Sequence, residues 1–373
     1  MAYLSQLRLR SFRNYASLDL DLVSGFNVLV GGNGQGKSNV LEGICYLALL
    51  RSFRSRRIAP LKQWESEGFF VSGKLSGREG GSPSAELSVG YGEKRVLQLN
   101  GQSIEKASDF INSFICVTLV PEDIELVTGT AGLRRRFLDI FLCQVDPLYL
   151  MNLQRYQEAL RCRNLMLRRP DKYPEQAFAS YEHLLIEHGA FLVASRIRWI
   201  ELLNASLAAL SPQLFPETDL TVCVVFSPSL PRCLDTTGSQ ADVMACFSEA
   251  LDRFRDRDLN EGGTRCGPHR DGFTFQLNGR DVALFGSEGE RRASCLALRL
   301  ACLNLVRENC GDGRPVVLLV DDVFGELDPA RRGALFGALA QADQVFVTCT
   351  EISEELQDLS PAVYKVENGG ITS

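Results

Sequence analysis

Hydrophobic and polar positions alternate over the first part of the chain, and this alternation predicts β-strands. The segments LRLRSF (residues 7–12) and ASLDLDL (residues 16–22) place apolar side chains at about every second position, as a strand with one buried face does. The next segment, FNVLV (residues 26–30), is apolar almost throughout, which is typical of a strand buried on both faces of a parallel sheet. A helix with an apolar stripe is expected directly after the glycine-rich loop that follows.

The region between Phe69 and Ile104 has a different pattern, with short strands separated by turn residues. Asn100-Gly101 lies between two such strands, and this dipeptide is typical of a type I′ hairpin turn. We therefore expect an antiparallel flap beside the main sheet.

Apolar residues recur at a spacing of three to four between Pro147 and about Leu210, which predicts helices. The segment RRPDKYPEQ (residues 168–176) interrupts the pattern. The result expected is a helical hairpin of a few turns. A sustained coiled coil needs several unbroken heptads, and this interval is too short to supply them.

The last part of the chain returns to a pattern of strands and helices. It predicts a buried strand, a helix, a second strand and an edge hairpin, in VVLLVDD (316–322), PARRGALFGALA (329–340), QVFVTCT (344–350) and AVYKVENGGI (362–371). We expect one α/β domain whose two halves, residues 1–145 and 259–373, are separated by a mostly helical lobe at residues 146–258.

Composition narrows the possible classes of protein. The chain has 373 residues, of which 45% are hydrophobic, so it is long enough for a large divided core. A net charge of -6 gives no overall attraction to nucleic acid, so any DNA binding must come from local basic patches. The 12 cysteines include no CxxC pair, which favours reduced thiols over a zinc site. No window approaches the roughly 20 apolar residues of a membrane span, and we expect a cytoplasmic protein without a membrane partner.

The stretch GGNGQGKS satisfies the pattern G-x-x-x-x-G-K-[ST], with a strand expected before it and a helix after it. Backbone N–H groups of such a loop converge on phosphates, a lysine reaches the β- and γ-phosphates, and a hydroxyl binds Mg²⁺. The predicted nucleotide-binding residues are Gly31, Gly32, Asn33, Gly34, Gln35, Gly36, Lys37, Ser38 and Asn39, with Lys37 also catalytic and Ser38 a metal ligand.

A phosphate-binding loop needs a second strand that ends in carboxylates, and VVLLVDD supplies one far along the chain. Asp321 is expected to hold Mg²⁺ through water, and Asp322 to orient the attacking water as the catalytic carboxylate. The long separation of the two motifs excludes compact GTPase and kinase layouts. It indicates a split ATPase head.

A third motif precedes that strand. Ser287 and Gly289, in GSEGER, resemble the signature motif of ABC-type ATPases, in which a serine and a helix N-terminus bind the γ-phosphate held by the opposite subunit. Ser287 with Glu290 also has the spacing of a capping box, and both roles are compatible. In such an arrangement ATP is bound by both subunits and therefore holds a homodimer together.

With these motifs in order, the chain resembles the RecF family of bacterial DNA-repair ATPases, relatives of SMC-type heads, over nearly its whole length. The resemblance rests on SFRNY (11–15), GGNGQGKSNVLEGI (31–44), PEDIELVTGTAGLRRRFLD (121–139), GPHRD (267–271) and DDVFGELD (321–328). It implies an α/β fold, a split P-loop ATPase head of the ABC/SMC type (lobe I) with an inserted helical lobe (lobe II) and no long coiled coil. It also places Arg13 of SFRNY among the nucleotide-binding residues.

The chain departs from the family pattern at several positions. Glu288 and Glu290 stand where the signature usually has glutamine, and Gly325 stands where the D-loop usually has serine or alanine. After QVFVTCT there is no switch histidine of the transporter kind, and Thr348 or Thr350 stands in that region. The extra negative charge near a γ-phosphate is the departure with the clearest physical consequence.

The resemblance implies a function in recombination. The expected protein binds ATP and Mg²⁺, dimerises on junctions of double-stranded and single-stranded DNA, and hydrolyses ATP slowly with stimulation by DNA. It is expected to work with RecR and RecO so that RecA is loaded at gaps, in gap repair, replication restart and SOS induction. Asp322 replaces the glutamate of transporters, and its shorter reach to water suits a switch more than a motor.

Basic clusters remain open to more than one interpretation. Arg51, Arg54, Arg56 and Arg57 lie in one short loop, where they could contact DNA phosphates, sense ATP across a dimer, or simply be solvated. Arg134 to Arg136 stand at a helix start, where cations oppose the helix dipole and need an anionic partner. Glu122 or Asp123 is a candidate for that partner, or alternatively for a position near the Mg²⁺ as the Q-loop equivalent. His269 is expected to be a structural residue of a turn.

Three other classes of function compete with this hypothesis. An ABC transporter subunit would need a membrane partner and the switch histidine, and a chromosome-structural SMC protein would need long coiled coils. A DNA clamp that binds ATP without significant hydrolysis has the same sequence features as the preferred hypothesis and stays open as an alternative.

Overall fold

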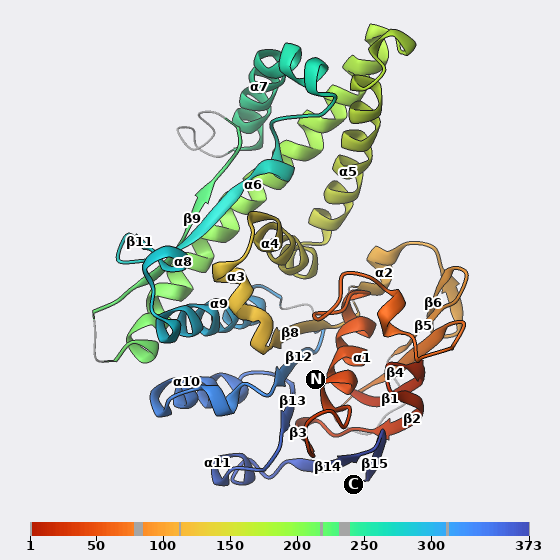
Figure 1. Ribbon diagram of the computed structural model, residues 1–373, viewed down its shortest axis with the longest axis vertical. Coiled ribbons are helices and arrows are strands. Elements are labelled where there is room, and N and C mark those ends of the chain that lie inside the picture. The colour runs from red at the N-terminus through yellow and green to blue at the C-terminus, as the bar shows by residue number, and fades with distance from the viewer. Residues whose placement is uncertain are drawn as a thin grey trace. The chain divides into compact units, whose positions relative to one another are not determined.

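The computed structural model describes residues 2–77, 85–111, 113–216, 219–230, 239–310 and 313–372, and it divides into two compact units (Figure 1). The first unit combines Met1–Asp123 with Leu296–Ser373, and the second is Ile124–Cys295. The first unit is therefore assembled from the two ends of the chain, as the split head requires. These divisions differ from the boundaries at 145/146 and 258/259 that the sequence pattern suggests.

A six-stranded, mostly parallel sheet forms one layer of the first unit. Its strand order is β15-β14-β3-β13-β12-β8, and β15 is the antiparallel edge. The strands are β3 (Gly25–Val30), β8 (Ile115–Leu119), β12 (Val316–Asp321), β13 (Gln344–Cys349), β14 (Ala362–Glu367) and β15 (Gly370–Thr372). The predicted buried strands and the edge hairpin are confirmed. β3, β13 and β12 run parallel, with β13 between the other two. The loops that follow β3 and β12 therefore emerge at the same end of the sheet, the carboxyl end of its parallel strands.

A second, antiparallel sheet has the order β2-β1-β4-β5-β6-β7. Its strands are β1 (Ala2–Phe12), β2 (Tyr15–Asp21), β4 (Phe69–Gly77), β5 (Ala85–Tyr91), β6 (Arg95–Leu99) and β7 (Gln102–Ile104). The predicted flap is confirmed, and it also includes the first two strands of the chain. Asn100 and Gly101 have φ of 53° and 76°, so both central residues of the β6–β7 turn are left-handed, as a type I′ turn requires.

Helix α1 (Lys37–Leu49) packs against strands of both sheets, including β4 and β12. This position explains its sequence, because a helix covered on both sides must be apolar nearly all round. From Val40 to Leu49 every side chain of α1 is buried. The smaller elements of this unit are η1 (Ala59–Leu61), α2 (Ala107–Ile111), η2 (Pro121–Asp123), η6 (Phe324–Glu326), α10 (Pro329–Leu339) and α11 (Glu354–Gln357).

The second unit is built around long helices. It holds α3 (Ile124–Thr128), α4 (Ala131–Val145), α5 (Pro147–Leu167), η3 (Pro170–Lys172), α6 (Glu175–Leu214), α7 (Gln240–Glu261), η5 (Pro268–Arg270), α8 (Val282–Phe285) and the start of α9 (Glu288–Asn309). The hairpin of α5 and α6 is confirmed, although α6 has 40 residues and is about 60 Å long, well beyond a few turns.

A three-stranded antiparallel sheet, β11-β10-β9, accompanies these helices and was not predicted. β9 (Val222–Ser227) pairs with β10 (Gly272–Leu277), which also pairs with β11 (Arg280–Asp281). The expected boundary at 258/259 would separate β9 from β10. Pairing between strands so distant in sequence leaves no local pattern in the sequence. For this reason the second unit ends at Cys295 and not at the expected residue 258.

Candidate nucleotide site

The glycine-rich loop connects β3 to α1, and two of its glycines have backbone conformations that other residues rarely adopt. Gly34 and Gly36 have φ of 77° and 115°. Gly31 is needed for a different reason, since a Cβ there would lie 2.3 Å from the carbonyl oxygen of Val366. The loop thus needs glycine because of its curvature and because β14 lies close behind it.

Lys37 lies across this loop. Its Nζ donates to the carbonyl oxygens of Gly31, at 2.6 Å, and Gly32, at 2.9 Å, and the residue is only 6% exposed. The ammonium is therefore held over the loop by backbone acceptors. An anionic phosphate in the loop would be a stronger partner for this cation than neutral carbonyls are.

Asp321, the last residue of β12, is the central acceptor of the site. Its Oδ1 accepts from Ser38 Oγ at 2.8 Å and from Thr348 Oγ1 at 2.7 Å, and the residue is 5% exposed. The structure thus brings together Ser38 and Asp321, the predicted metal ligands, although 283 positions separate them. A serine hydroxyl and a carboxylate are oxygen donors of the kind Mg²⁺ prefers, so the pair fits that ion.

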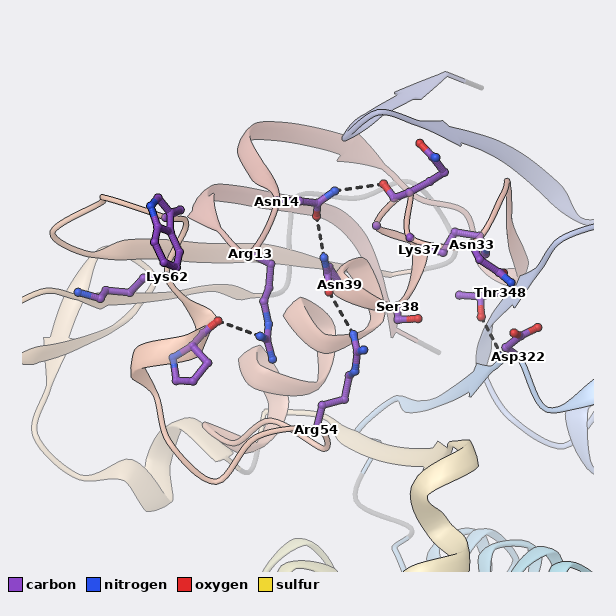
Figure 2. A pocket seen from close by; sticks show the side chains of 15 residues that line it. Arg13, Asn14, Asn33, Lys37, Ser38, Asn39, Arg54, Lys62, Asp322 and Thr348 are labelled. Carbon is purple, nitrogen blue, oxygen red and sulfur yellow. Dashed lines mark hydrogen bonds between the residues drawn. The ribbon is translucent and has the colours of Figure 1, made fainter.

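Asp322 follows the strand in an unusual conformation. Its φ is 48°, a left-handed value, and its N–H donates to Thr348 Oγ1 at 2.9 Å. Figure 2 shows Asp322 beside Thr348; Asp322 is exposed and lines the cavity, whereas Asp321 is buried. Of the two threonines that the sequence left open, Thr348 joins both aspartates through its hydroxyl.

Lys37, Ser38, Asp322 and Thr348 line one cavity of about 510 Å³, within the range of small-ligand sites. Figure 2 shows the labelled residues of its wall, with Lys37, Thr348 and Asp322 toward one side and Lys62 toward the other. The lining residues are Arg13, Asn14, Asn33, Gly34, Gln35, Gly36, Lys37, Ser38, Asn39, Arg54, Pro60, Lys62, Trp64, Asp322 and Thr348. All of them belong to the first unit.

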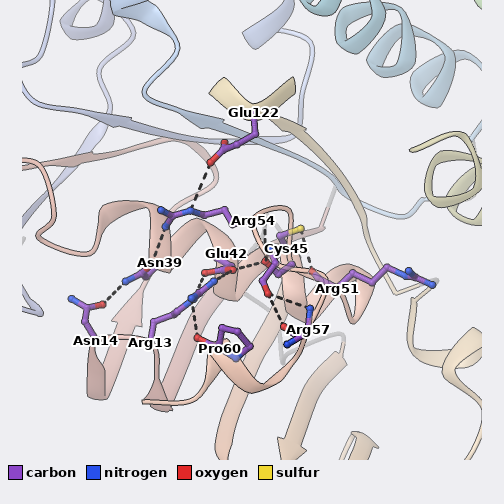
Figure 3. A network of polar contacts seen from close by, with 12 residues as sticks. Arg13, Asn14, Asn39, Glu42, Cys45, Arg51, Arg54, Arg57, Pro60 and Glu122 are labelled. Atoms are coloured by element: carbon purple, nitrogen blue, oxygen red, sulfur yellow. Dashed lines mark hydrogen bonds and ion pairs between the residues drawn. The ribbon is translucent and has the colours of Figure 1, made fainter. Parts of the chain in front are cut away.

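Arg13 lines the cavity, but its guanidinium is already engaged (Figure 3). It forms a bidentate pair with Glu42, at 2.7 Å and 2.6 Å, and donates to the Pro60 carbonyl at 2.8 Å. Glu42 is fully buried on α1 and also accepts from Ser52 Oγ. The structure therefore places Arg13 where it braces the segment around the cavity.

Of the four arginines in the basic loop, Arg54 is the one that lines the cavity. It donates to Asn39 Oδ1 at 3.3 Å and lies 3.9 Å from Glu122 (Figure 3). Arg51, Arg56 and Arg57 are exposed. Arg54 is therefore the candidate for a contact with ATP, and the other three arginines are candidates for contacts at the surface.

Several supporting residues were missed by sequence reasoning. Asn14 Nδ2 donates to the Gln35 carbonyl at 3.1 Å, and Tyr15 donates its hydroxyl to the Gly36 carbonyl at 3.1 Å. Asn14 Oδ1 accepts from Asn39 at 2.7 Å. Asn14 and Tyr15 both lie in SFRNY (residues 11–15). Burial raises the pKa of Tyr15, so its hydroxyl remains a donor.

Cys349 lies at the end of β13, directly after Thr348. Burial raises the pKa of its thiol to about 11, and the charge of Lys37 only partly offsets that rise. The thiol is therefore protonated at neutral pH and serves as packing rather than as a nucleophile. All described cysteines are free thiols.

The signature-like motif lies in the second unit and forms the predicted capping box. Glu290 Oε2 accepts from the Ser287 N–H at 2.7 Å and from the Ser287 Oγ at 2.8 Å. The Glu290 N–H donates in turn to Ser287 Oγ at 3.2 Å. The Ser287 groups that a signature motif would offer to a phosphate are thus bonded to a carboxylate of the same chain. Glu288 is paired instead with Arg292, at 2.8 Å.

Two other family-like boxes meet at a buried arginine. Arg196 of α6 pairs with Asp139 and Asp271, each at 2.7 Å, and its Nε donates to the Tyr149 hydroxyl at 3.0 Å. Arg135 donates to the Asp271 carbonyl at 2.6 Å. Removing one member of such a buried network leaves an uncompensated charge, so these boxes hold the second unit together. Arg134 donates to the carbonyls of Val127 and Gly129.

His269 takes part in the same region as a structural residue. Its Nε2 lies 3.0 Å from the Thr264 carbonyl, which can only accept, so Nε2 carries the proton. Nδ1, 2.6 Å from the Tyr156 hydroxyl, is then the acceptor. Burial lowers the pKa of His269 to about 4, which keeps the ring neutral in this arrangement. His269 thus lies in η5 with both ring nitrogens engaged by groups of the same unit, which agrees with the structural role expected of it.

None of the helices in the part of the chain described by the structure combines the length and apolar character of a membrane span.

Comparison with known proteins places these features in a family. The chain matches the model of the "RecF/RecN/SMC N terminal domain" over residues 3–371. It is 34% identical over 364 residues to the DNA replication and repair protein RecF of Symbiobacterium thermophilum, covering 98% of this chain and 96% of the relative. It is 31% identical over 376 residues to the protein of that name from Geobacillus sp. (strain WCH70), covering 100% and 99%.

A solved structure agrees with this match. The recombination mediator protein RecF with ATP, of the RecFOR pathway, superposes with a TM-score of 0.87 at 27% sequence identity, covering 100% of this chain and 97% of that one. The protein described here, with its split phosphate-loop head and inserted helical unit, belongs to the RecF family.

Proposed function

We propose that the protein is an ATP-dependent DNA-binding recombination mediator, in which ATP binding drives dimerisation and slow hydrolysis resets the dimer. The observation that carries this proposal is that Asp321 bonds both Ser38 and Thr348, two residues of a cavity that Lys37 and Asp322 also line. This arrangement has the parts of a nucleoside triphosphatase: a phosphate loop, a cation, a pair of metal ligands and a carboxylate for water.

Each residue then has a separate task. The loop N–H groups and the N-terminus of α1 bind the phosphates, and Lys37 turns from the Gly31 and Gly32 carbonyls to the β- and γ-phosphates. Ser38, and Asp321 through water, would hold Mg²⁺, which would neutralise phosphate charge. Asp322 orients the attacking water and accepts its proton. Asn39, Arg13 and Arg54 support the wall of the site.

Dimerisation is proposed to complete the site. Ser287 and Gly289 of a second copy would contact the γ-phosphate through the start of α9. The proposal is supported by the position of Ser287 at a helix start. ATP binding then favours the dimer by mass action, because the nucleotide binds the closed form more tightly.

The cellular role is inferred from the family. Relatives are named DNA replication and repair proteins, and the superposed structure is called a recombination mediator of the RecFOR pathway. We infer that this chain binds junctions of double-stranded and single-stranded DNA in the cytoplasm. There it works with RecR and RecO and indirectly with RecA, in gap repair, replication restart and SOS induction. Arg51, Arg56 and Arg57 are exposed cations available for phosphate contacts.

A specific observation also favours one alternative function. A DNA clamp that binds ATP without significant hydrolysis would agree with the short reach of Asp322 and with the carboxylate of Glu290 on the signature serine. Phosphate release with and without DNA separates the two, since only the proposed switch turns over. Membership of the RecF family argues against the transporter alternative.

Sedimentation of the full chain with ATP and a gapped duplex tests the proposal. We expect a monomer without nucleotide, a dimer with ATP, and co-sedimentation of the dimer with DNA. A chain that stays monomeric at saturating ATP, or that binds the duplex equally without nucleotide, would contradict the ATP-driven mechanism.

Glu290→Gln should make dimerisation easier. A neutral amide bonds Ser287 less strongly than a carboxylate does and does not repel the γ-phosphate of a partner copy. We expect the ATP concentration at half-maximal dimerisation to fall about threefold to tenfold, because about 1 kcal/mol corresponds to roughly fivefold. Light scattering against ATP concentration measures the midpoint.

The matched control is Glu288→Gln, which removes the same charge two positions away but leaves the Ser287 contacts in place. It should move the midpoint less than Glu290→Gln does. Equal shifts for both variants would mean that overall charge, and not the cap on Ser287, governs dimerisation.

A further inference from the structure

Trp64 is the most exposed of the large hydrophobic side chains that the structure describes, at 89%. It is also a lining residue of the nucleotide cavity, where most neighbours are polar or glycine. Exposing a whole indole to water forgoes the stabilisation that burial of so large an apolar surface would give. An aromatic side chain kept exposed at the wall of a ligand cavity therefore suggests a binding role.

The backbone around Trp64 is firmly held. The Arg13 N–H donates to the Leu61 carbonyl at 2.8 Å, and the Gln63 N–H donates to the Ser11 carbonyl at 2.7 Å, which ties this segment to the end of β1. The Ser66 N–H then closes a turn onto the Gln63 carbonyl at 3.1 Å. Trp64 is the second residue of that turn.

The third residue of the turn, Glu65, has φ of 64°, a conformation that favours glycine. Ser66 Oγ adds a second bond to the Gln63 carbonyl, at 2.8 Å. The turn that presents Trp64 therefore has a strained backbone at Glu65. The hydrogen bonds of Gln63 and Ser66 on either side keep it in that conformation.

We propose that Trp64 stacks on the purine base of the nucleotide whose phosphates lie on the glycine loop. This inference rests on the proposed ATP-binding function and assigns the base-recognition residue of the same site. The cavity is polar around Lys37, Ser38 and Asp322, where phosphates would lie, and it offers Pro60 and Trp64 as apolar lining. A nucleotide has the same polarity, with charge at one end and a flat ring at the other.

The placement of neighbouring residues agrees with this orientation. Figure 2 shows Lys62, two positions before Trp64, on the side of the cavity away from Lys37, Thr348 and Asp322. A triphosphate seated on the loop would extend its sugar and base away from Asp322. An aromatic face on that side of the cavity can bind the base by stacking, which does not depend on how the polar edge of the base is turned.

Tryptophan fluorescence gives a direct test, because the chain has 2 tryptophans and the other, Trp199, is buried at 7% exposure against Phe141. Wild type, Trp64→Phe and Trp64→Ala are titrated with Mg-ATP and with Mg-tripolyphosphate, which lacks a base. Equilibrium dialysis gives both dissociation constants, and wild-type emission is followed in parallel. Since Trp64 is exposed, neither substitution removes core packing.

We expect ATP to quench wild-type emission and to protect it from acrylamide, with tripolyphosphate doing neither. Trp64→Ala should weaken ATP binding about tenfold, in line with the loss of one base–aromatic stack, and leave tripolyphosphate binding unchanged. Trp64→Phe should retain most of the ATP affinity. It also reports the signal of Trp199 alone, which should not respond to ATP.

Equal ATP affinity of wild type and Trp64→Ala, with tripolyphosphate still bound, would overturn the stacking inference and leave the proposed function standing. Absence of binding by both ligands to wild type would instead overturn the proposed function. Quenching by a single-stranded oligonucleotide but not by ATP would assign Trp64 to nucleic acid and overturn the inference as well.

Discussion

Replacing Asp322 with asparagine will lower ATP hydrolysis by about 10²- to 10⁴-fold, the range by which a general base accelerates such a reaction. The amide cannot accept a proton from water, but it keeps nearly the same shape. Asparagine also tolerates the left-handed conformation that Asp322 adopts at φ 48°, so the turn should survive the change. Single-turnover phosphate release from the ATP-bound protein measures the rate.

The same variant should hold the protein in its ATP-bound dimer for longer, because the step that resets the dimer is slowed. Light scattering after ATP is diluted or chased with ADP would show slower decay than wild type. Asp358→Asn, which removes an equal charge from an exposed position of the same unit, is the matched control and should behave as wild type. Asp322→Asn that binds ATP normally and yet decays at the wild-type rate would rule out this role.

Replacing Lys37 with alanine will abolish ATP-dependent dimerisation at ATP concentrations that saturate the wild type. Lys37 Nζ is held at 2.6 Å and 2.9 Å by the Gly31 and Gly32 carbonyls, so the cation is poised over the phosphate loop. Hydrogen bonds to charged groups contribute roughly 1.5 to 3 kcal/mol each, so losing two such bonds from Lys37 to the β- and γ-phosphates predicts a fall in ATP affinity of at least about 100-fold. Equilibrium dialysis measures the affinity and sedimentation the dimer.

Lys365→Ala is the matched control for Lys37→Ala, because Lys365 is an exposed lysine on β14 of the same sheet and does not line the cavity. It should bind ATP and dimerise as wild type does. If Lys37→Ala still dimerised with ATP, the argument that the nucleotide joins two copies would be lost. If it dimerised without ATP, the closed form would not depend on phosphate binding.

The arrangement at Glu290 has a consequence for how the protein would be regulated. In the structure of the single chain the carboxylate of Glu290 bonds both the N–H and the hydroxyl of Ser287. Any phosphate that reaches this serine must displace the carboxylate or share its donors. In the proposed dimer, this contact would oppose closure on the γ-phosphate, and a glutamine at this position would oppose it less.

The sequence by itself determined the phosphate loop and the strand that ends in two aspartates. Both are local patterns: glycines at positions that need φ above zero, such as Gly34 and Gly36, and an apolar run before Asp321. The type I′ turn at Asn100 and Gly101 was predictable for the same reason. Such features depend only on backbone sterics and on residues a few positions apart.

The tertiary structure alone decided which distant groups meet. Thr348 joins Asp321 because β13 and β12 are paired in that register, and Arg13 is engaged by Glu42 because α1 is buried beneath β1. The pairing of β9 with β10 and the ends of the two units are equally non-local. Contacts of this kind join residues well separated in the chain, 27 positions for Asp321 and Thr348 and 29 for Arg13 and Glu42, and they depend on packing and register, for which a single sequence carries no local signal.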